Sequence, residues 1–276
     1  MDFSSDVLTL EVDDHVATRW LDRPDKRNAM SPEFIADLPR AMAAIGDDDS
    51  VRVAVIAGRG KSFCVGIDLA SLSGAPSGTD ADKVSGATAS LRQMKVTRDF
   101  QAAISAVADC PVPVIAAIHS HCLGAGMDLV TACDIRLAAE DALFGVRETK
   151  IGIVADVGTL QRLPGIVANG QVAELAYTGK DIGAQRAEKI GLVNDVYADA
   201  EAVCAAAREL AAEIAANAPL AVRGTKFILQ QGEDLTTEQS LLLNGLWTMV
   251  TTLNSSDLRE AMQAYSQGRP AKYTGT

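Results

Sequence analysis

The sequence predicts an α/β core followed by a helical extension. Short apolar runs typical of strands occur between residues 8 and 144, where they alternate with longer segments of helical periodicity. From about Gly158 to the end of the chain, the pattern is almost wholly helical. Hydrophobic residues make up 48% of the 276 residues and charged residues 22%, which excludes a disordered or low-complexity protein.

The predicted strands are short apolar segments bounded by turn residues. Two of them, Leu8–Val12 and His15–Leu21, flank Asp13–Asp14 and predict a hairpin. The others are Val51–Ala57, Val114–His119, Ile135–Ala139 and Leu143–Phe144. Glycine-bearing loops follow two of these strands, so we expect the chemistry of the protein to lie where those strands end.

The predicted helices carry recognisable start signals. Ser31, Pro32 and Glu33 supply an N-cap, a first-turn proline and an early acid for a helix that runs to about Ile45. Further helices are expected over 87–108 and 124–133, and then beyond residue 158 with breaks near 165–170, 179–183, 219 and 255.

Charge and cysteine usage exclude several classes of protein. The formal net charge is −11, whereas a general nucleic-acid binder needs a basic footprint. No apolar run approaches the roughly 18 residues of a transmembrane helix, and the N-terminus has an acid where a signal peptide is basic. Five scattered cysteines without a CxxC motif predict buried thiols in a reducing compartment. We therefore expect a soluble, cytoplasmic protein without a nucleic-acid or membrane partner.

The histidines do not predict a metal site. His119 and His121 would share one face of a strand, as metal ligands can, but no further histidine or cysteine lies at ligand spacing. We expect no bound metal.

Two glycine-bearing turns are candidate anion sites. Val65–Asp68 follows one predicted strand, and Leu123–Gly126 follows another and begins a helix. Each turn places backbone N–H groups beyond a strand, and two converging N–H donors make an oxyanion hole. The alternative is that both are only tight turns. Gly124–Leu129 lacks the third glycine of a dinucleotide motif, and the chain has neither a GxSxG nor a P-loop sequence.

Three acids follow the second turn closely. Asp128 lies in the first turn of the predicted helix, where the helix dipole favours the ionised form. Asp156 interrupts the apolar run Ile151–Val157, so it either caps a neighbouring element or lies in a dry pocket suited to proton exchange. Glu148 by itself is equally consistent with a solvated ion pair. Their significance depends on whether the three carboxylates converge.

Several spaced segments resemble one known family. RPDKRNAM (23–30), SFCVGIDL (62–69), CLGAGMDLVTACDIRL (122–137) and RPAKY (269–273) are similar, in order and spacing, to the signature segments of the enoyl-CoA hydratase/isomerase (crotonase) superfamily. Within it, residues 128–164 look most like the Δ3,5-Δ2,4-dienoyl-CoA isomerases. The resemblance implies a crotonase-like spiral of ββα turns over residues 1–200. It also implies a C-terminal helical trimerisation region over 201–276, giving homotrimers or hexamers built as dimers of trimers.

The resemblance also implies a role for each site residue. The N–H groups of Ile67 and Ala125 would hold the oxygen of an acyl-CoA thioester; Ala125 replaces the usual glycine and keeps its N–H. Asp128, Glu148 and Asp156 would be the catalytic acids. The substrate-binding positions would be Lys26, Arg27, Val65, Gly66, Asp68, Leu69 and Gly124. Lys26 and Arg27 fall in a loop that the family uses near the nucleotide of coenzyme A.

These roles predict an isomerase that moves two conjugated double bonds of a 3,5-dienoyl-CoA to the 2,4 positions. The proposed assignment is Glu148 at C2 and Asp156 at C6, with Asp128 orienting or tuning the pair. No cofactor is expected, since coenzyme A is part of the substrate. One alternative is a 2-enoyl-CoA hydratase, which needs only Asp128 and Glu148 and leaves Asp156 without a role. A second is a non-catalytic acyl-CoA-binding or RNA-binding protein of the same fold.

Overall fold

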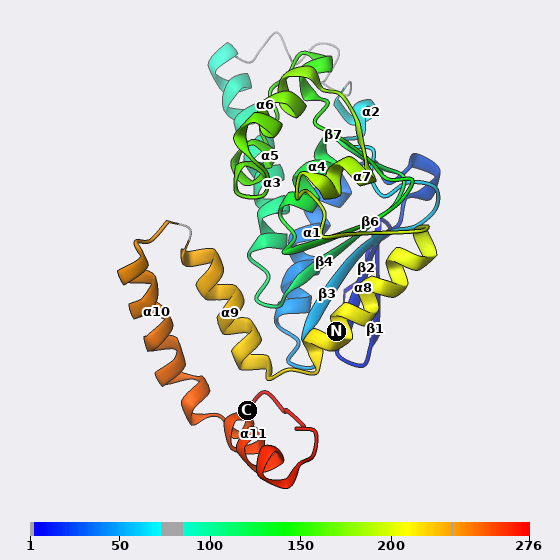
Figure 1. Ribbon diagram of the computed structural model, residues 1–276. Helices are drawn as coiled ribbons and strands as arrows, with labels where there is room; N and C mark the ends of the chain where they lie inside the picture. Colours follow the sequence, from blue (N-terminus) through cyan, green and yellow to red (C-terminus); the bar gives the residue numbers. More distant parts are fainter. Residues whose placement is uncertain (1–2, 73–84, 233) are drawn as a thin grey trace.

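The computed structural model describes residues 3–72, 85–232 and 234–276, and within them the strands form two sheets (Figure 1). The larger sheet has the order β1-β2-β3-β4-β6-β9, in which only the β1–β2 pair is antiparallel. The smaller sheet has the order β5-β7-β8. The strands are β1 (Leu8–Asp13), β2 (Val16–Leu21), β3 (Val53–Gly58), β4 (Val114–Ile118), β5 (His121–Leu123), β6 (Ile135–Ala139), β7 (Leu143–Gly145), β8 (Ile182–Gly183) and β9 (Asp195–Tyr197).

Helices connect the parallel strands and continue to the C-terminal end. The α-helices are α1 (Pro32–Gly46), α2 (Leu69–Leu72), α3 (Gly86–Ala108), α4 (Ala125–Thr131), α5 (Thr159–Arg162), α6 (Asn169–Thr178), α7 (Ala184–Lys189), α8 (Ala200–Ala215), α9 (Pro219–Gly232), α10 (Thr237–Val250) and α11 (Ser256–Gln267). Single 3₁₀ turns are η1 (Pro24–Lys26), η3 (Glu148–Ile151), η4 (Leu163–Gly165) and η5 (Thr252–Asn254). The predicted cap at Ser31 is confirmed, because its side chain accepts a hydrogen bond from the Phe34 N–H.

The large sheet is buried on both faces, which explains why its central strands are continuous apolar runs. On one face, Ala54 and Ile56 of β3 belong to a core that α1 and α3 complete. On the other face, Val53 and Val55 pack against α8, whose alanines Ala207 and Ala211 are fully buried. The predicted α/β class is therefore confirmed.

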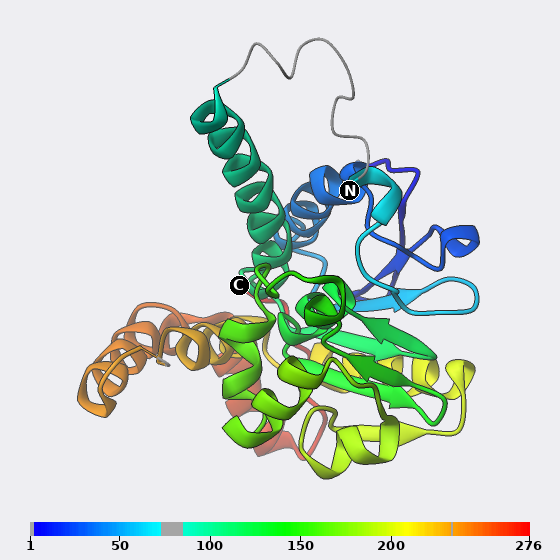
Figure 2. The ribbon, with the colours of Figure 1, turned by 90° about the horizontal axis from the view of Figure 1, so that it is seen from above.

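The C-terminal helices α9, α10 and α11 leave the body of the molecule after α8 (Figures 1 and 2). Helix α8 belongs to the sheet core, so the projecting arm begins after Ala215, later than the predicted division at residue 200. Lys226 fastens the arm to the core: it is 6% exposed, and its Nζ donates to the Asp134 carboxylate at 2.8 Å and to the Val112 carbonyl at 3.0 Å.

The structure differs from the sequence prediction in its shortest strands. Beyond residue 158 the sequence predicts only helices, whereas the structure adds β8 and β9. Such strands of two or three residues are too short to display alternation, and only their pairing partners identify them. The predicted strand through His119 ends at Ile118, because the chain turns at Ser120, which has a positive φ of 51°, before β5 begins. Among the helices that the structure describes, none is long and apolar enough to cross a membrane.

Candidate active site

Two adjoining cavities lie on the α3 side of the large sheet, and the predicted site residues line them. The first has a volume of about 420 Å³ and the second about 500 Å³. Among the predicted residues, the first cavity is lined by Val65, Gly66, Ile67, Leu69, Gly124, Ala125, Asp128, Glu148 and Asp156. The second is lined by Lys26, Arg27, Val65, Ile67, Asp68 and Leu69. All twelve residues thus lie on two connected cavities, although they come from four separate stretches of the chain.

The two glycine turns lie against each other. Gly66 and Gly124 have positive φ values of 99° and 53°, which L side chains rarely adopt. A Cβ built on Gly66 would lie 3.5 Å from the Ala125 nitrogen, and one built on Gly124 would lie 3.8 Å from the Gly66 Cα. Two backbone hydrogen bonds hold the turns: the Met30 N–H donates to Gly66, and the Gly124 N–H donates to Gly145. The positive φ values therefore favour glycine at both positions.

This approach places two backbone donors beside the first cavity. Ile67 and Ala125 both line it, and neither N–H donates a hydrogen bond to another residue that the structure describes. Ala125 is the first residue of α4, where the helix supplies no acceptor for its N–H. An oxygen bound in the cavity could accept from both groups, as an oxyanion hole requires.

Glu148 is a buried carboxylate at the centre of the first cavity. It begins η3, which follows β7 after two intervening residues, and the residue is 9% exposed. Its Oε2 atom is buried without a hydrogen-bond partner in the described part of the chain. Burial, together with the negative charges of Asp128 and Asp156, raises the pKa of Glu148 to about 6. A carboxylate with that pKa can exchange a proton near neutral pH.

Asp128 is more deeply buried than Glu148. Asp128 is 1% exposed, and its Oδ1 accepts a 2.6 Å hydrogen bond from the Thr159 N–H. Burial raises the pKa of Asp128, although the hydrogen bond from Thr159 acts in the opposite direction. Burial is therefore the dominant influence on the pKa of Asp128, whereas the sequence led us to expect that the helix dipole would favour the ionised form.

Asp156 lies at the other side of the same cavity but is exposed in the single chain. Of the two alternatives that the sequence leaves open for Asp156, the dry pocket is therefore not found in the single chain. The apolar run around it is buried only in part: Ile153 is 47% exposed and Val154 is 68% exposed, whereas Ala155 and Val157, on either side of Asp156, are buried in the core. These residues belong to an irregular segment between η3 and α5 rather than to a strand or helix.

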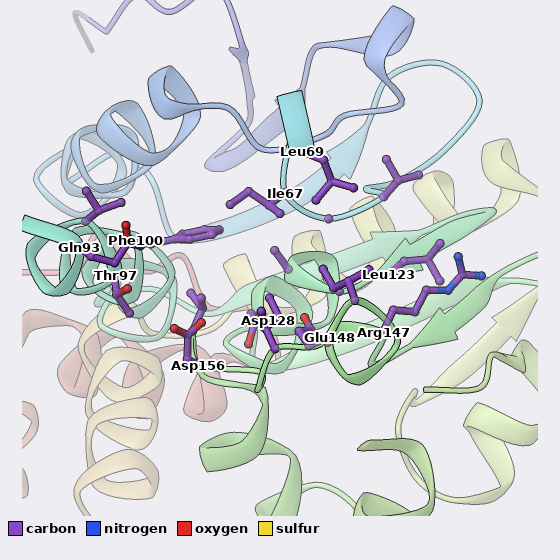
Figure 3. Close-up of a pocket in the computed structure, with 18 residues that line it drawn as sticks. Ile67, Leu69, Gln93, Thr97, Phe100, Leu123, Asp128, Arg147, Glu148 and Asp156 are labelled. Atoms are coloured by element: carbon purple, nitrogen blue, oxygen red, sulfur yellow. The ribbon is translucent and has the colours of Figure 1, made fainter. Parts of the chain in front are cut away.

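The acids follow one another along the cavity (Figure 3). Asp156 lies beside Gln93 and Thr97 of α3, Asp128 and Glu148 lie near the centre, and Arg147 extends from the opposite end. Ile67 approaches from the other side of the cavity, across from the acids. A linear ligand with an oxygen between the Ile67 and Ala125 N–H groups would therefore have Glu148 close to that oxygen and Asp156 farther along its chain.

Sequence reasoning missed several lining residues. Arg147 borders both cavities, and its guanidinium pairs with the Asp181 carboxylate, with Nε donating to Oδ1 at 2.8 Å. Gln93 and Thr97 line the far end and are four residues apart on α3, a spacing that places them on one helix face. That spacing was present in the sequence, but nothing there indicated which face meets the acids.

The second cavity is the more polar one. Lys26 and Arg27 line it at the end of η1, together with Asp25 and His121. Within the described chain no cluster of three or more His, Cys, Asp or Glu residues could hold a metal ion. His119 and His121 do not share a strand face; His119 Nε2 bonds the Gly60 carbonyl and His121 Nδ1 bonds the Ser120 hydroxyl.

Comparison with known proteins supports an acyl-CoA enzyme. The family described as enoyl-CoA hydratase/isomerase matches residues 11–276. The peroxisomal Δ3,5-Δ2,4-dienoyl-CoA isomerase of Arabidopsis thaliana is 37% identical over 268 residues, covering 97% of this chain and 96% of the relative. The mitochondrial enzyme of the same name from Homo sapiens is 41% identical, covering 94% and 78%.

Solved structures give the same fold. An enoyl-CoA hydratase from Bacillus anthracis superposes with a TM-score of 0.88 at 30% identity, covering 98% of this chain and all of that one. A structure described as a putative enoyl-CoA hydratase from Streptomyces coelicolor also reaches a TM-score of 0.88, at 32% identity, covering 98% and 94%. The crotonase-type architecture expected from the sequence motifs is thereby confirmed. The chain is an enzyme of the enoyl-CoA hydratase/isomerase family.

Proposed function

We propose that the protein is a Δ3,5-Δ2,4-dienoyl-CoA isomerase. The observation that carries the proposal is the row of three carboxylates along one cavity, which is also lined by two residues whose backbone N–H groups have no acceptor in the described chain. The identity of 37–41% to dienoyl-CoA isomerases from several organisms supports it. A hydratase needs two acids, whereas a 1,5 proton shift gives the third acid, Asp156, a role.

The first step would be proton removal from C2. The thioester carbonyl binds between the Ile67 and Ala125 N–H groups, which stabilise the negative charge that develops on its oxygen. Glu148 takes a C2 proton, and the electron pair of that C–H bond enters the conjugated system, which becomes a trienolate with double bonds at C1–C2, C3–C4 and C5–C6. Burial raises the pKa of Glu148 to about 6, so the residue is ionised at neutral pH and yet basic enough to accept the proton.

The second step would be proton delivery to C6. As the trienolate collapses, the thioester carbonyl re-forms, the C2–C3 and C4–C5 double bonds form, and C6 takes a proton from Asp156. Because Asp156 is exposed, it can regain a proton from water, while Glu148 returns its own to solvent. Asp128, buried beside them, adds negative charge that helps to raise the pKa of Glu148. The reaction is thus redox-neutral and requires only the substrate and water as a proton reservoir.

Direct comparison of two substrates tests the proposal. We expect the purified protein to convert a 3,5-dienoyl-CoA to the 2,4-dienoyl-CoA, followed by absorbance of the conjugated thioester. Crotonyl-CoA, the short substrate of a hydratase, should lose its absorbance much more slowly. Rapid hydration of crotonyl-CoA without formation of a 2,4-dienoyl product would instead favour the 2-enoyl-CoA hydratase. Absence of both reactions would favour a non-catalytic member of the family.

Lys26 and Arg27 are proposed to bind phosphate groups of coenzyme A in the second cavity. Changing both to Ala should raise KM for the acyl-CoA by about tenfold, the scale of losing one or two charge-assisted hydrogen bonds, and leave kcat within about twofold. The measurement is a steady-state titration at low salt. A Lys189→Ala/Arg208→Ala variant removes the same charge from outside both cavities and should behave like wild type. Unchanged KM in the first variant would make both residues ordinary solvated loop residues.

The C-terminal arm supports a homotrimer or a dimer of trimers. Several large apolar side chains of α10 are more than half exposed in the single chain: Leu241, Leu242, Leu246, Met249 and Val250. Apolar faces of this kind usually mark protein–protein contacts. We propose that these residues pack against other copies of the chain.

A further inference from the structure

Asp156 is carried by a segment without regular secondary structure. The segment runs from Gly152 to Gly158, and both glycines have positive φ values, 78° and 137°. Neither a helix nor a strand fixes the carboxylate, unlike Asp128 on α4 and Glu148 at the start of η3. Ala155 and Val157, on either side of Asp156, are buried in the main core and anchor the backbone there. Polar contacts with a neighbouring element add to this anchor.

Helix α3 supplies these contacts from a single stripe of polar residues. Gln93, Thr97, Gln101 and Ser105 follow one another at intervals of four residues, so they lie along one side of the helix. The first two line the cavity. The next two hold the acid-bearing segment: Gln101 Nε2 donates to the Asp156 carbonyl at 2.6 Å, and Ser105 Oγ accepts from Arg162 at 2.9 Å.

The second contact fixes the far end of the same segment. Arg162 ends α5, which begins directly after Gly158. Its guanidinium folds back over that glycine, since a Cβ built on Gly158 would lie 1.9 Å from Arg162 Nη1. Helix α3 thus bonds the segment at Asp156 and bonds the following helix α5 at Arg162, and the same helix forms part of the wall of the cavity that Asp156 faces.

We propose that Gln101 is a positioning residue that holds Asp156 at the distance along the cavity where it can reach C6 of the substrate. The inference rests on the proposed isomerase function and extends it to a residue that does not touch the substrate. Gln101 is exposed and does not line the cavity, so its amide has no role in packing the acyl chain. Its hydrogen bond ends on the backbone of the acid itself, and a shift of about 1 Å in a catalytic group can cost about 10²-fold in rate.

Two substitutions of Gln101 distinguish the effect of its hydrogen-bond donor from the effect of its side-chain length. Gln101→Met keeps the length and removes the donor, whereas Gln101→Lys keeps both length and donor. We expect Gln101→Met to lower kcat for isomerisation by about tenfold with KM within about twofold, and Gln101→Lys to restore kcat to within about threefold of wild type. Exchange of the C2 proton with heavy water, which depends on Glu148, should continue at the wild-type rate in both variants.

The control is Lys95→Met, which removes an exposed ion pair with Asp99 elsewhere on α3 and should leave both rates unchanged. Wild-type isomerisation by Gln101→Met would overturn the inference and leave the proposed function intact. Equal losses of isomerisation and C2 exchange would also overturn it, because Gln101 would then affect the whole site. A wild-type protein that does not isomerise 3,5-dienoyl-CoA would instead remove the proposed function itself.

Discussion

Replacing Glu148 by Gln is expected to reduce kcat for isomerisation by about 10²–10⁴-fold, the usual range for losing one general base. The amide has the same shape but cannot take a proton from C2. Exchange of the C2 proton with heavy water should fall in parallel, because both processes begin with the same step. Glu140→Gln, an exposed acid outside the cavities, is the matched control and should keep full activity.

The raised pKa of Glu148 predicts that both activity and stability depend on pH. Because the pKa of Glu148 is raised to about 6, wild-type kcat/KM should decline as pH falls through about 6. Ionising this buried acid costs folding free energy above that pH, and the cost disappears below its unfolded pKa. Glu148→Gln should therefore have a higher free energy of unfolding than wild type at pH 8, by about 1–2 kcal/mol, and no advantage near pH 4. The difference in unfolding free energy between Glu148→Gln and wild type should thus be larger at pH 8 than at pH 4. A smaller difference at pH 8 than at pH 4 would contradict this electrostatic account.

The second large effect is expected at Asp156. The change to Asn should lower isomerisation by about 10²–10⁴-fold, because the acid that protonates C6 is lost. The fold should persist, since the side chain is exposed. Unlike Glu148→Gln, this variant should still exchange the C2 proton, because Glu148 and the two backbone donors are intact. Asp109→Asn, at the exposed C-terminal end of α3, tests whether any loss of an acid has the same effect.

The two glycine turns could be predicted from the sequence for a simple reason. Each follows a buried strand, and β3 and β4 are parallel neighbours, so the segments after them leave the sheet at the same edge. The order of the strands alone therefore predicts that the turns at Gly66 and Gly124 lie close together, as the structure shows. The residue types of Asp128 and Glu148 were visible as well, but their convergence came from the family resemblance and not from local pattern.

The surroundings of Asp156 could not be predicted in the same way. The run Ile151–Val157 has the composition of a buried strand, yet only Ala155 and Val157 reach the core, Gly152 and Gly158 have positive φ values on either side of Asp156, and α3 bonds the Asp156 carbonyl. Gln101 lies 55 residues away in sequence, and its bond to the Asp156 carbonyl depends only on how α3 packs. Local sequence cannot specify such a contact, since neither residue type nor spacing distinguishes Gln101 from any other exposed glutamine.

The fate of solvent deuterium tests the central claim, that carboxylates at two points of one cavity act at C2 and C6 of a trienolate. A 3,5-dienoyl-CoA is incubated in heavy water with wild type and with Asp156→Asn, and deuterium at C2 and C6 is located by NMR. The account predicts C6-labelled 2,4-dienoyl-CoA from wild type, and from the variant C2-labelled starting material with almost no product. Formation of C6-labelled product by Asp156→Asn at the wild-type rate would contradict it.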